Sequence, residues 1–293
     1  MSIVEEIKNR FANDNAISKI IFLNVVVFLF FGIAQVLFFL FGLNNPLIEI
    51  KSWFYLYASF DNFIYKPWGI LTYMFLHDGF FHILFNMLWL YWLGGLLQEY
   101  LGNSKTYQAY FLGGIFGGLI YIISYNIFPV FQNSLPISFA LGASAGVLSV
   151  LVAAATLLPD YPIMLLFFGE VRLKFIAIFS VLLDIINIPS GNAGGHIAHL
   201  GGALFGYLFI KFIYSKSNMP NALDKIFDGI FSIFKTKSKM KVHYKNNTTN
   251  MNSIANRKTN QHDVDAILDK ISKSSYESLS QKEKEILFKA SKD

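Results

Sequence analysis

The sequence predicts an all-α integral membrane protein with six transmembrane helices, a cytoplasmic amphipathic helix and a small helical tail. Of the 293 residues, 54% are hydrophobic and only 15% are charged, whereas a soluble domain carries roughly 25% charged residues. Charge is also unevenly placed, since 16 of the 24 Lys and Arg lie between Lys211 and Lys292. We therefore expect a membrane domain at 1–214, an amphipathic helix with a polar linker at 215–262, and a helical tail at 263–293.

Composition also limits the chemistry. The chain has no cysteine, which excludes a thiol nucleophile, a Cys-based zinc site and disulfides, so catalysis would use Ser, Thr, His or carboxylates. The net charge of +5 comes from lysines near the membrane domain. Such lysines fit an anionic lipid surface, so we expect the lipid bilayer, and no nucleic acid, as a partner.

The first two spans are long apolar runs. About 20 apolar residues are needed to cross a bilayer. Ile20 to Leu43 is uncharged, and it is longer than the apolar region of a secretion signal, so we expect it to be retained as a first span. The second span is predicted at Gly79 to Gln98.

Four further spans follow. No charge occurs from Thr106 to Pro159, and prolines at 129 and 136 divide this stretch into a third span and a fourth. The fifth, Phe175 to Ile188, is short and contains Asp184. The sixth begins after the segment PSGNAGG and continues to Ile210.

Lysine and arginine predict the orientation. Basic residues precede the first span, follow the sixth, and lie in the second-to-third and fourth-to-fifth connections, whereas the opposite loops contain only Lys51 and Lys66. The positive-inside rule then places both termini in the cytoplasm, so the even-numbered helices run from outside to inside. Many Lys, Phe, Ile and Asn with few Arg favour an AT-rich bacterial genome, and hence the bacterial cytoplasmic membrane.

Polar residues begin each of these even-numbered helices. His82 and Asn86 lie in the second span, Ser144 in the fourth and His199 in the sixth, and the helical rise places all of them roughly 6–12 Å below the outer surface. Each alone is explained by ordinary helix packing or hydrogen bonding. Their common depth on three helices favours a site, because polar groups are costly in hydrocarbon.

The residue types fit serine hydrolysis. A serine hydroxyl becomes nucleophilic when an imidazole takes its proton, and the resulting oxyanion needs hydrogen-bond donors. Ser144 follows Gly142 and Ala143 after an irregular stretch, which predicts a helix N-terminus with free backbone N–H groups. The side chains of Asn86 and His82 would add donors. Small residues that allow close helix packing are Gly142, Gly146, Gly202 and Gly206.

Residues 66 to 210 resemble the rhomboid family of intramembrane serine proteases. The resemblance rests on H-x-x-x-N at His82 and Asn86, G-x-S at Gly142 to Ser144, and A-H-x-x-G-x-x-x-G at Ala198 to Gly206. It implies a six-helix core, a Ser144–His199 dyad, and oxyanion donors at His82, Asn86 and the Ser144 amide. It also implies cleavage of transmembrane protein substrates without a metal or cofactor.

Three positions depart from the family pattern. Ala145 stands where a glycine is common, Trp68 is followed by Gly69 where many members have arginine, and Leu148 replaces an aromatic residue often found beneath the histidine. These changes affect the loop geometry and the stacking of the histidine, and they leave the dyad intact. The sequence assigns no role to His196 or Asp184.

The remaining segments suggest a gate and a separate tail. The short fifth span and the glycine-rich IPSGNAGG segment are interpreted either as a substrate gate or as an ordinary flexible connection. An amphipathic helix is predicted at 222–235 and an unstructured linker at 245–261. Periodic apolar residues after 263, and a Ser280–Glu283 capping box, predict a helical hairpin, for which an unidentified binding partner stays open.

Two other classes of protein remain as alternatives. One is a catalytically inactive rhomboid-like protein that binds membrane proteins, although such proteins usually lack the serine or the histidine. The other is a metal-dependent enzyme or transporter using His77, His82, His196 and His199. The motif H-E-x-x-H is absent, and no carboxylate has an obvious place beside these histidines, so we expect no metal.

Overall fold

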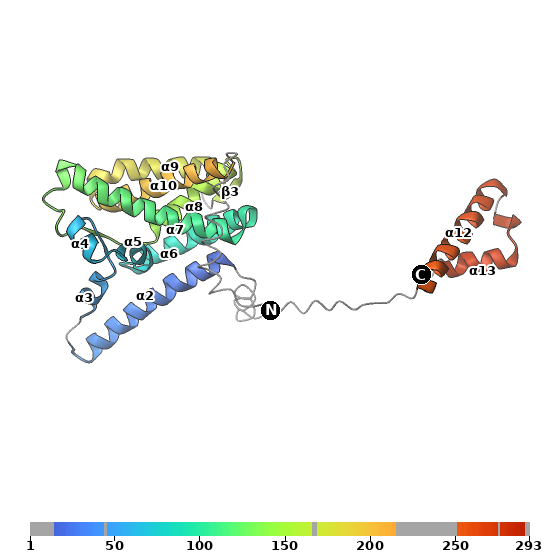
Figure 1. Cartoon of the computed structure of the whole chain (residues 1–293), viewed down its shortest axis with the longest axis horizontal. Helices are drawn as coiled ribbons and strands as arrows, with labels where there is room; N and C mark the ends of the chain where they lie inside the picture. The colour runs from blue at the N-terminus through green and yellow to red at the C-terminus, as the bar shows by residue number, and fades with distance from the viewer. Residues whose placement is uncertain (1–14, 44–45, 166–168, 215–250, 275, 291–293) are drawn as a thin grey trace. The chain divides into compact units, whose positions relative to one another are not determined.

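A computed structural model describes residues 15–43, 46–165, 169–214, 251–274 and 276–290. The chain forms two compact units, residues 1–238 and 239–293. Both are built mainly from helices, and each is described by itself (Figure 1). The amphipathic helix predicted at 222–235 lies outside the described residues.

In the described residues of the first unit there are α-helices, short 3₁₀ turns, one π-helical turn (η2) and two small β-ladders. Its elements are α2 (Ala16–Leu40), α3 (Leu47–Ser52), β1 (Leu56–Tyr57), α4 (Phe60–Tyr65), α5 (Gly69–Thr72), η1 (Tyr73–Phe75), α6 (Phe80–Trp89), η2 (Leu90–Gly94), α7 (Gly95–Ile127), η3 (Pro129–Phe131), β2 (Phe139–Ala140), α8 (Ser144–Leu157), β3 (Pro162–Leu165), β4 (Gly169–Arg172), α9 (Leu173–Asn187), η4 (Ile188–Ser190) and α10 (Ala193–Tyr214).

Four helices in the described part of the chain are long and apolar enough to cross a membrane. They are α2, the continuous segment Phe80–Ile127, the segment Leu173–Ser190, and α10, and α8 is a shorter apolar helix. The segment Phe80–Ile127 is interrupted at Gly102, whose φ of 76° is not helical. Glycine reaches this left-handed region without a Cβ clash. The interruption separates the runs that the sequence assigns to the second and third spans.

Helices α7, α8 and α10 pack against one another at the centre of the unit, and α9 lies beside α10 (Figure 1). Most side chains of α8 are buried. By contrast, α2 and α9 expose many large apolar side chains, among them Phe30 and Phe39 of α2 and Phe179 of α9. Large contiguous apolar surfaces of this kind mark contacts with a membrane or a protein. In a membrane protein they are the surfaces that lipid covers.

Glycines bring α10 close to α8. A Cβ built on Gly202 would overlap the carbonyl oxygen of Ala145, and one built on Gly206 would overlap that of Ser149. On the other side of α8, a Cβ on Gly146 would lie 2.8 Å from the carbonyl oxygen of Tyr110 in α7. Small residues at these crossings allow the backbones to touch. These three glycines therefore set the distances between the central helices, as the sequence predicts.

The connection after α2 is an ordered aromatic layer. Trp68 donates its indole N–H to the carbonyl oxygen of Trp53 at 2.6 Å, and the two rings stack with centroids 6.3 Å apart. A Cβ on Gly69 would lie 2.5 Å from the carbonyl oxygen of Tyr55. This close approach accounts for glycine at position 69.

The same layer is joined to the segment that leads to Ser144. Leu56 of β1 pairs with Ala140 of β2 in an antiparallel ladder, and the Gly142 N–H donates to the carbonyl oxygen of Tyr73 at 2.9 Å. A second ladder, β3 with β4, connects α8 to α9. Thus the backbone just before Ser144 is held from two sides.

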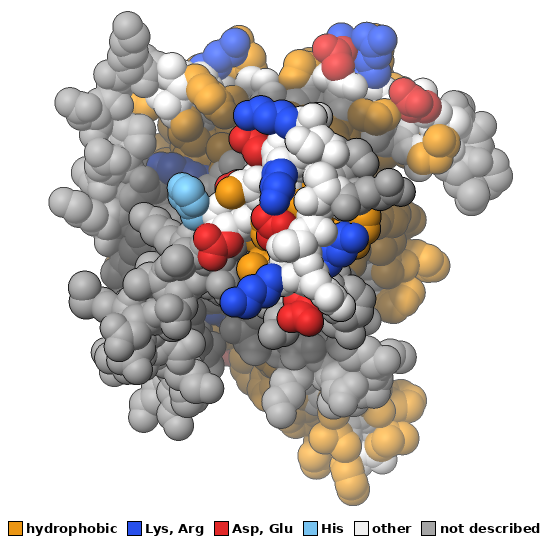
Figure 2. Space-filling model, turned by 90° about the vertical axis from the view of Figure 1, so that its right-hand side faces the viewer, with side chains coloured by type: hydrophobic (Ala, Val, Ile, Leu, Met, Phe, Trp, Pro, Cys, Tyr) orange, Lys and Arg blue, Asp and Glu red, His pale blue; other side chains and the backbone are white. Residues whose placement is uncertain are grey.

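The second unit contains α12 (Met251–Ser274), η5 (Tyr276–Ser278) and α13 (Gln281–Ala290). The predicted capping box is confirmed, since the Ser280 N–H donates to Oε2 of Glu283 at 2.7 Å and the Glu283 N–H donates to Oγ of Ser280 at 3.4 Å. Lys270 of α12 also contacts Glu283, at 2.9 Å. Figure 2 shows basic and acidic side chains interspersed on one face of this unit.

The prediction of an unstructured linker at 245–261 is wrong from Met251 onward, because α12 begins there. No glycine or proline occurs between Met251 and Ser274. Once the apolar turns after 263 have nucleated a helix, each residue added at its N-terminus gains a hydrogen bond at little further cost. Polarity alone therefore does not end the helix.

We predict that Gly202→Ala destabilises the first unit, because the added methyl would overlap the Ala145 carbonyl. Overpacking typically costs about 1–3 kcal/mol, which corresponds to a fall in Tm of roughly 2–10 °C. Thermal unfolding in detergent measures this effect. Gly32→Ala in α2 is the matched control, since a Cβ there has nothing within 4 Å. Equal Tm values for the two variants would contradict the packing assignment.

We also predict that Glu283 titrates far below an ordinary glutamate. Hydrogen bonds from Lys270 and from Ser280 lower the pKa of Glu283 from 4.5 to about 2. Because the folded pKa is depressed, the contribution to stability is fully present above pH 4.5 and is lost as pH falls through about 2. An NMR titration of the Ser280 amide should have its midpoint near pH 2. A midpoint near 4.5 would show that the capping box is absent in solution.

Candidate active site

Ser144 occupies the first turn of α8. The helix begins at Ser144, with Ala143 as its N-cap residue, so the N–H groups of this first turn have no partner within the helix. Gly142 has a φ of 126°, a left-handed conformation that favours glycine. The sharp turn before the helix therefore presents the serine hydroxyl beside a set of free backbone donors, as the sequence predicts.

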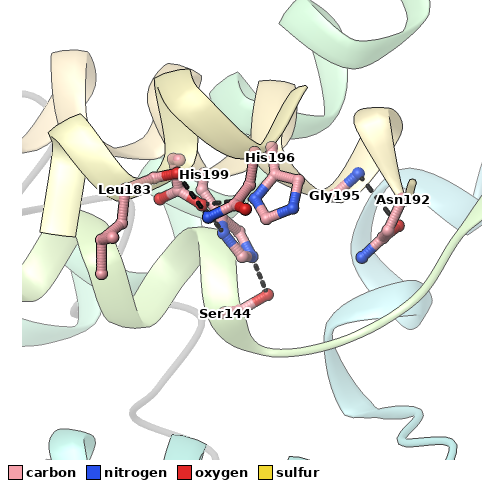
Figure 3. A network of polar contacts seen from close by, with 8 residues as sticks. Ser144, Leu183, Asn192, Gly195, His196 and His199 are labelled. Carbon is pink, nitrogen blue, oxygen red and sulfur yellow. Dashed lines mark hydrogen bonds and ion pairs between the residues drawn. The ribbon is translucent and has the colours of Figure 1, made fainter. Parts of the chain in front are cut away.

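His199 lies directly opposite this hydroxyl. Its Nε2 is 2.6 Å from Oγ of Ser144, although the two residues are 55 positions apart. Figure 3 shows His199 on α10 directed toward Ser144 on α8, with the hydrogen bond dashed. Both side chains are only partly exposed. The arrangement is that of a nucleophile in contact with a general base.

Two residues without an assigned role complete this network. Asp184 of α9 places Oδ1 2.9 Å from Nδ1 of His199 and 2.7 Å from Nδ1 of His196. Asp184 is buried, with 9% of its surface exposed. The available signal was a charged residue inside an apolar span, which marks a functional site by default. Its partners could not be identified from the sequence, because the contact joins two different helices.

His82 and Asn86 lie on α6 beside the same turn. A Cβ built on Gly142 would lie 3.0 Å from Cε1 and Nε2 of His82 and 3.4 Å from Oγ of Ser144, so the His82 ring borders the serine. Asn86 donates one amide N–H to the carbonyl oxygen of His82 at 2.9 Å. An amide carries two N–H donors, and the second is available to a ligand. Gly142 thus lies against the side chains of His82 and Ser144, whereas the sequence predicts a role for it in close helix packing.

His77 precedes α6 and packs against His82. Their ring centroids are 4.9 Å apart in an edge-to-face arrangement. Burial lowers the pKa of His77 to about 3, so its ring is uncharged at neutral pH. His77 thus supports the ring of His82 from the side of the segment before α6.

The expectation that no carboxylate lies beside the histidines is wrong. Asp184, His196 and His199 place their nitrogen and oxygen atoms within 4.8 Å of one another. The carboxylate arrives from α9, which packs against α10, and sequence spacing does not reveal such a contact. The distances of 2.7 and 2.9 Å between the imidazole nitrogens and the carboxylate oxygen are those of hydrogen bonds. The contacts observed are thus those of a hydrogen-bonded network.

Comparison with known families identifies the fold. The family described as the rhomboid domain matches residues 65–216, which is more than half of the chain. The chain belongs to the rhomboid family. Together with the apolar helices, this assignment makes it an integral membrane protein. The match covers every element that contributes to the site, from His77 to His199.

Individual relatives agree with this assignment. RHOMBOID-like protein 12, mitochondrial, of Arabidopsis thaliana is 29% identical over 155 residues, which are 50% of this chain and 46% of that protein. Rhomboid protease GlpG of Serratia proteamaculans is 37% identical over 65 residues, 18% of this chain and 23% of that protein. GlpG of Salmonella newport is 32% identical over 56 residues, 19% and 20%. The chain thus spans about half of the plant protein and less than a quarter of the GlpG proteins.

The C-terminal unit matches a different family. Residues 252–293 correspond to a family of unknown function, DUF6576. The matched range covers nearly all of α12 and the whole of α13. The helical tail is therefore a recurring module that is distinct from the rhomboid domain.

Proposed function

We propose that this rhomboid is an intramembrane serine protease that hydrolyses peptide bonds in or near transmembrane segments of other membrane proteins. The observation that supports this most directly is the distance of 2.6 Å between Oγ of Ser144 and Nε2 of His199. A chain that had become only a binding protein would not need this contact. The relatives named rhomboid protease GlpG support the same reaction.

The reaction follows from the positions of the two side chains. His199 takes the Ser144 proton at Nε2 while Oγ attacks the carbonyl carbon of the substrate. The tetrahedral intermediate collapses to an acyl-enzyme, and the proton passes from His199 to the nitrogen of the leaving amine. Water, activated by the same imidazole, then releases the acid and restores Ser144. No metal or cofactor takes part.

The developing negative charge needs donors opposite His199. The backbone N–H of Ser144 at the start of α8 supplies one, aided by the positive end of the helix dipole. The free N–H of Asn86 and the ring of His82 supply the others. These groups belong to two helices that meet at Gly142, which explains why a residue with a side chain is absent there.

The topology proposed for this rhomboid has six spans. Gly102 divides Phe80–Ile127 into the second and third spans, and α8 is the fourth. Both termini lie in the cytoplasm by the positive-inside rule, in a bacterial cytoplasmic membrane. The peripheral position of α9, and the turn at Gly191 and Asn192 with φ values of 106° and 44°, make α9 and this turn the gate for a transmembrane substrate.

We predict that Ser144→Ala and His199→Ala each abolish cleavage of a transmembrane substrate in detergent. The losses should be similar, because members of a catalytic unit are not additive. A fluorophosphonate probe should label the wild-type protein and neither variant, and EDTA should leave activity unchanged.

Ser149→Ala is the matched control for the serine. Ser149 lies on the same helix, and its hydroxyl donates to the carbonyl oxygen of Ala109 at 2.8 Å, so this variant should keep both labelling and cleavage. Activity retained in Ser144→Ala would exclude a serine mechanism. A folded wild-type protein that is neither labelled nor active would favour the inactive relative, and loss of activity on chelation would favour a metal enzyme.

Asn86→Ala should be slow but still active. Loss of one oxyanion donor costs on the order of 10²–10³ in kcat, and the backbone amide of Ser144 remains. His82→Ala should show a loss of the same kind, and the fluorophosphonate should still label Ser144 in both. Steady-state kinetics separate kcat from KM. Unchanged turnover in both variants would remove these residues from the oxyanion site.

A further inference from the structure

Asp184 is an anionic residue in an apolar helix. Its neighbours Leu183, Ile185 and Ile186 are exposed on the surface that faces lipid, whereas Asp184 turns inward toward α10. A buried carboxylate without partners is strongly disfavoured. Here two imidazole nitrogens supply those partners, and both contact the same oxygen, Oδ1. The sequence pattern of the dyad does not require any of these contacts.

The contacts determine which nitrogen of His199 carries the proton. An ionised carboxylate only accepts hydrogen bonds, so Nδ1 of His199 must be the donor at 2.9 Å. A neutral imidazole with a proton on Nδ1 has a lone pair on Nε2. That lone pair faces Oγ of Ser144 at 2.6 Å, so the serine donates to it. This is the tautomer required for a general base.

We propose that Asp184 is a positioning residue that makes the dyad a Ser144–His199–Asp184 triad. The proposal rests on the serine protease function proposed above. In the reaction, Nε2 of His199 receives the serine proton, the imidazolium then carries a positive charge next to the carboxylate, and the proton leaves with the amine. Asp184 remains ionised throughout. It holds the ring orientation and the tautomer, and stabilises the charged imidazolium.

His196 has a supporting part in this arrangement. It lies one helical turn before His199 and donates to the same carboxylate oxygen from Nδ1. One oxygen accepts two hydrogen bonds, and the second donor keeps the carboxylate in place when the first imidazole changes its charge. Leu148, where an aromatic ring is often found beneath the histidine, has no polar group. In this chain the support for His199 therefore comes from α9.

The first test uses Asp184→Asn in the full-length protein. The substitution keeps the size of the side chain, but it removes the charge and adds an N–H that can donate to Nδ1 of His199, which favours the wrong tautomer. We expect kcat to fall on the order of 10²-fold or more, as for other triads, with KM unchanged. Thr156→Ala is the control, because Thr156 lies near the end of α8 away from Ser144 and its hydroxyl donates to the carbonyl oxygen of Val152 one turn earlier, at 2.7 Å. It should keep full activity.

The second test measures the tautomer directly, and its wild-type measurement does not depend on whether the variant folds. In ¹⁵N-histidine-labelled wild-type protein, the nitrogen chemical shifts of His199 should show the proton on Nδ1. In Asp184→Asn, part or all of it should move to Nε2. A wild-type His199 with its proton on Nε2 would overturn the proposal, whatever the kinetics of the variant.

The outcomes separate this proposal from the proposed function. If the wild type cleaves substrate and Asp184→Asn is equally fast, the triad is wrong and the dyad stands. If the wild type is neither labelled nor active, the protease function fails, and the tautomer measurement still decides whether Asp184 orients His199. A lower kcat in Asp184→Asn together with the change of tautomer supports both the protease function and the triad. A rise in KM alone would make Asp184 a substrate-binding or structural residue and overturn the proposal.

Discussion

Polar side chains inside a bilayer have no water to bond, so each must find its partner within the protein. In this rhomboid the constraint is met by one chain of contacts that runs from Ser144 through His199 and Asp184 to His196. This series of contacts joins side chains of α8, α10 and α9. It therefore does two things at once, because it satisfies four polar groups and fixes three helices relative to one another. The reactivity proposed for Ser144 depends on the same contacts.

The hydrogen bond between Ser144 and His199 requires the central helices to lie unusually close. Gly202 and Gly206 let the backbone of α10 touch that of α8, and Gly146 does the same between α8 and α7. With larger residues the helices would separate, and a contact of 2.6 Å could not form without a change in the side-chain positions. The hydrogen-bonded network therefore depends on the close packing of α7, α8 and α10.

The peripheral helices α2 and α9 differ from the central helices in the side chains that they expose. Outer faces of α2 and α9 are apolar and exposed, so they are stabilised by lipid and by few contacts with the protein. Asp184 is the exception on α9, since it anchors that helix to His199. Because Asp184 joins α9 to His199, a movement of the proposed gate would change the geometry of the proposed catalytic pair. In the described part of the C-terminal unit, Ile267 and Leu279 are buried, and α12 is joined to the start of α13 by the Lys270–Glu283 ion pair.

The sequence by itself determined the features that depend on residues close together along the chain. Apolar runs predicted the helices, the glycine before Ser144 predicted a helix N-terminus, and Ser280 with Glu283 predicted a cap that the structure contains. The orientation predicted from the positive-inside rule also put Ser144 and His199 at one depth, and the structure brings these two side chains into contact. Each of these inferences needs only the rise of a helix and the chemistry of neighbouring residues.

Only the tertiary structure decided how the helices are rotated about their axes. On α9 the exposed side is apolar and the buried side contains Asp184, so the usual rule that apolar side chains turn inward gives the wrong face. The pairing of Asp184 with His199 and His196 therefore could not be predicted from the sequence. The start of α12 at Met251 was missed for a related reason, because weak local preferences do not mark where a helix ends. Contacts between helices depend on packing of side chains that are distant in the chain, and a linear pattern carries no information on that rotation.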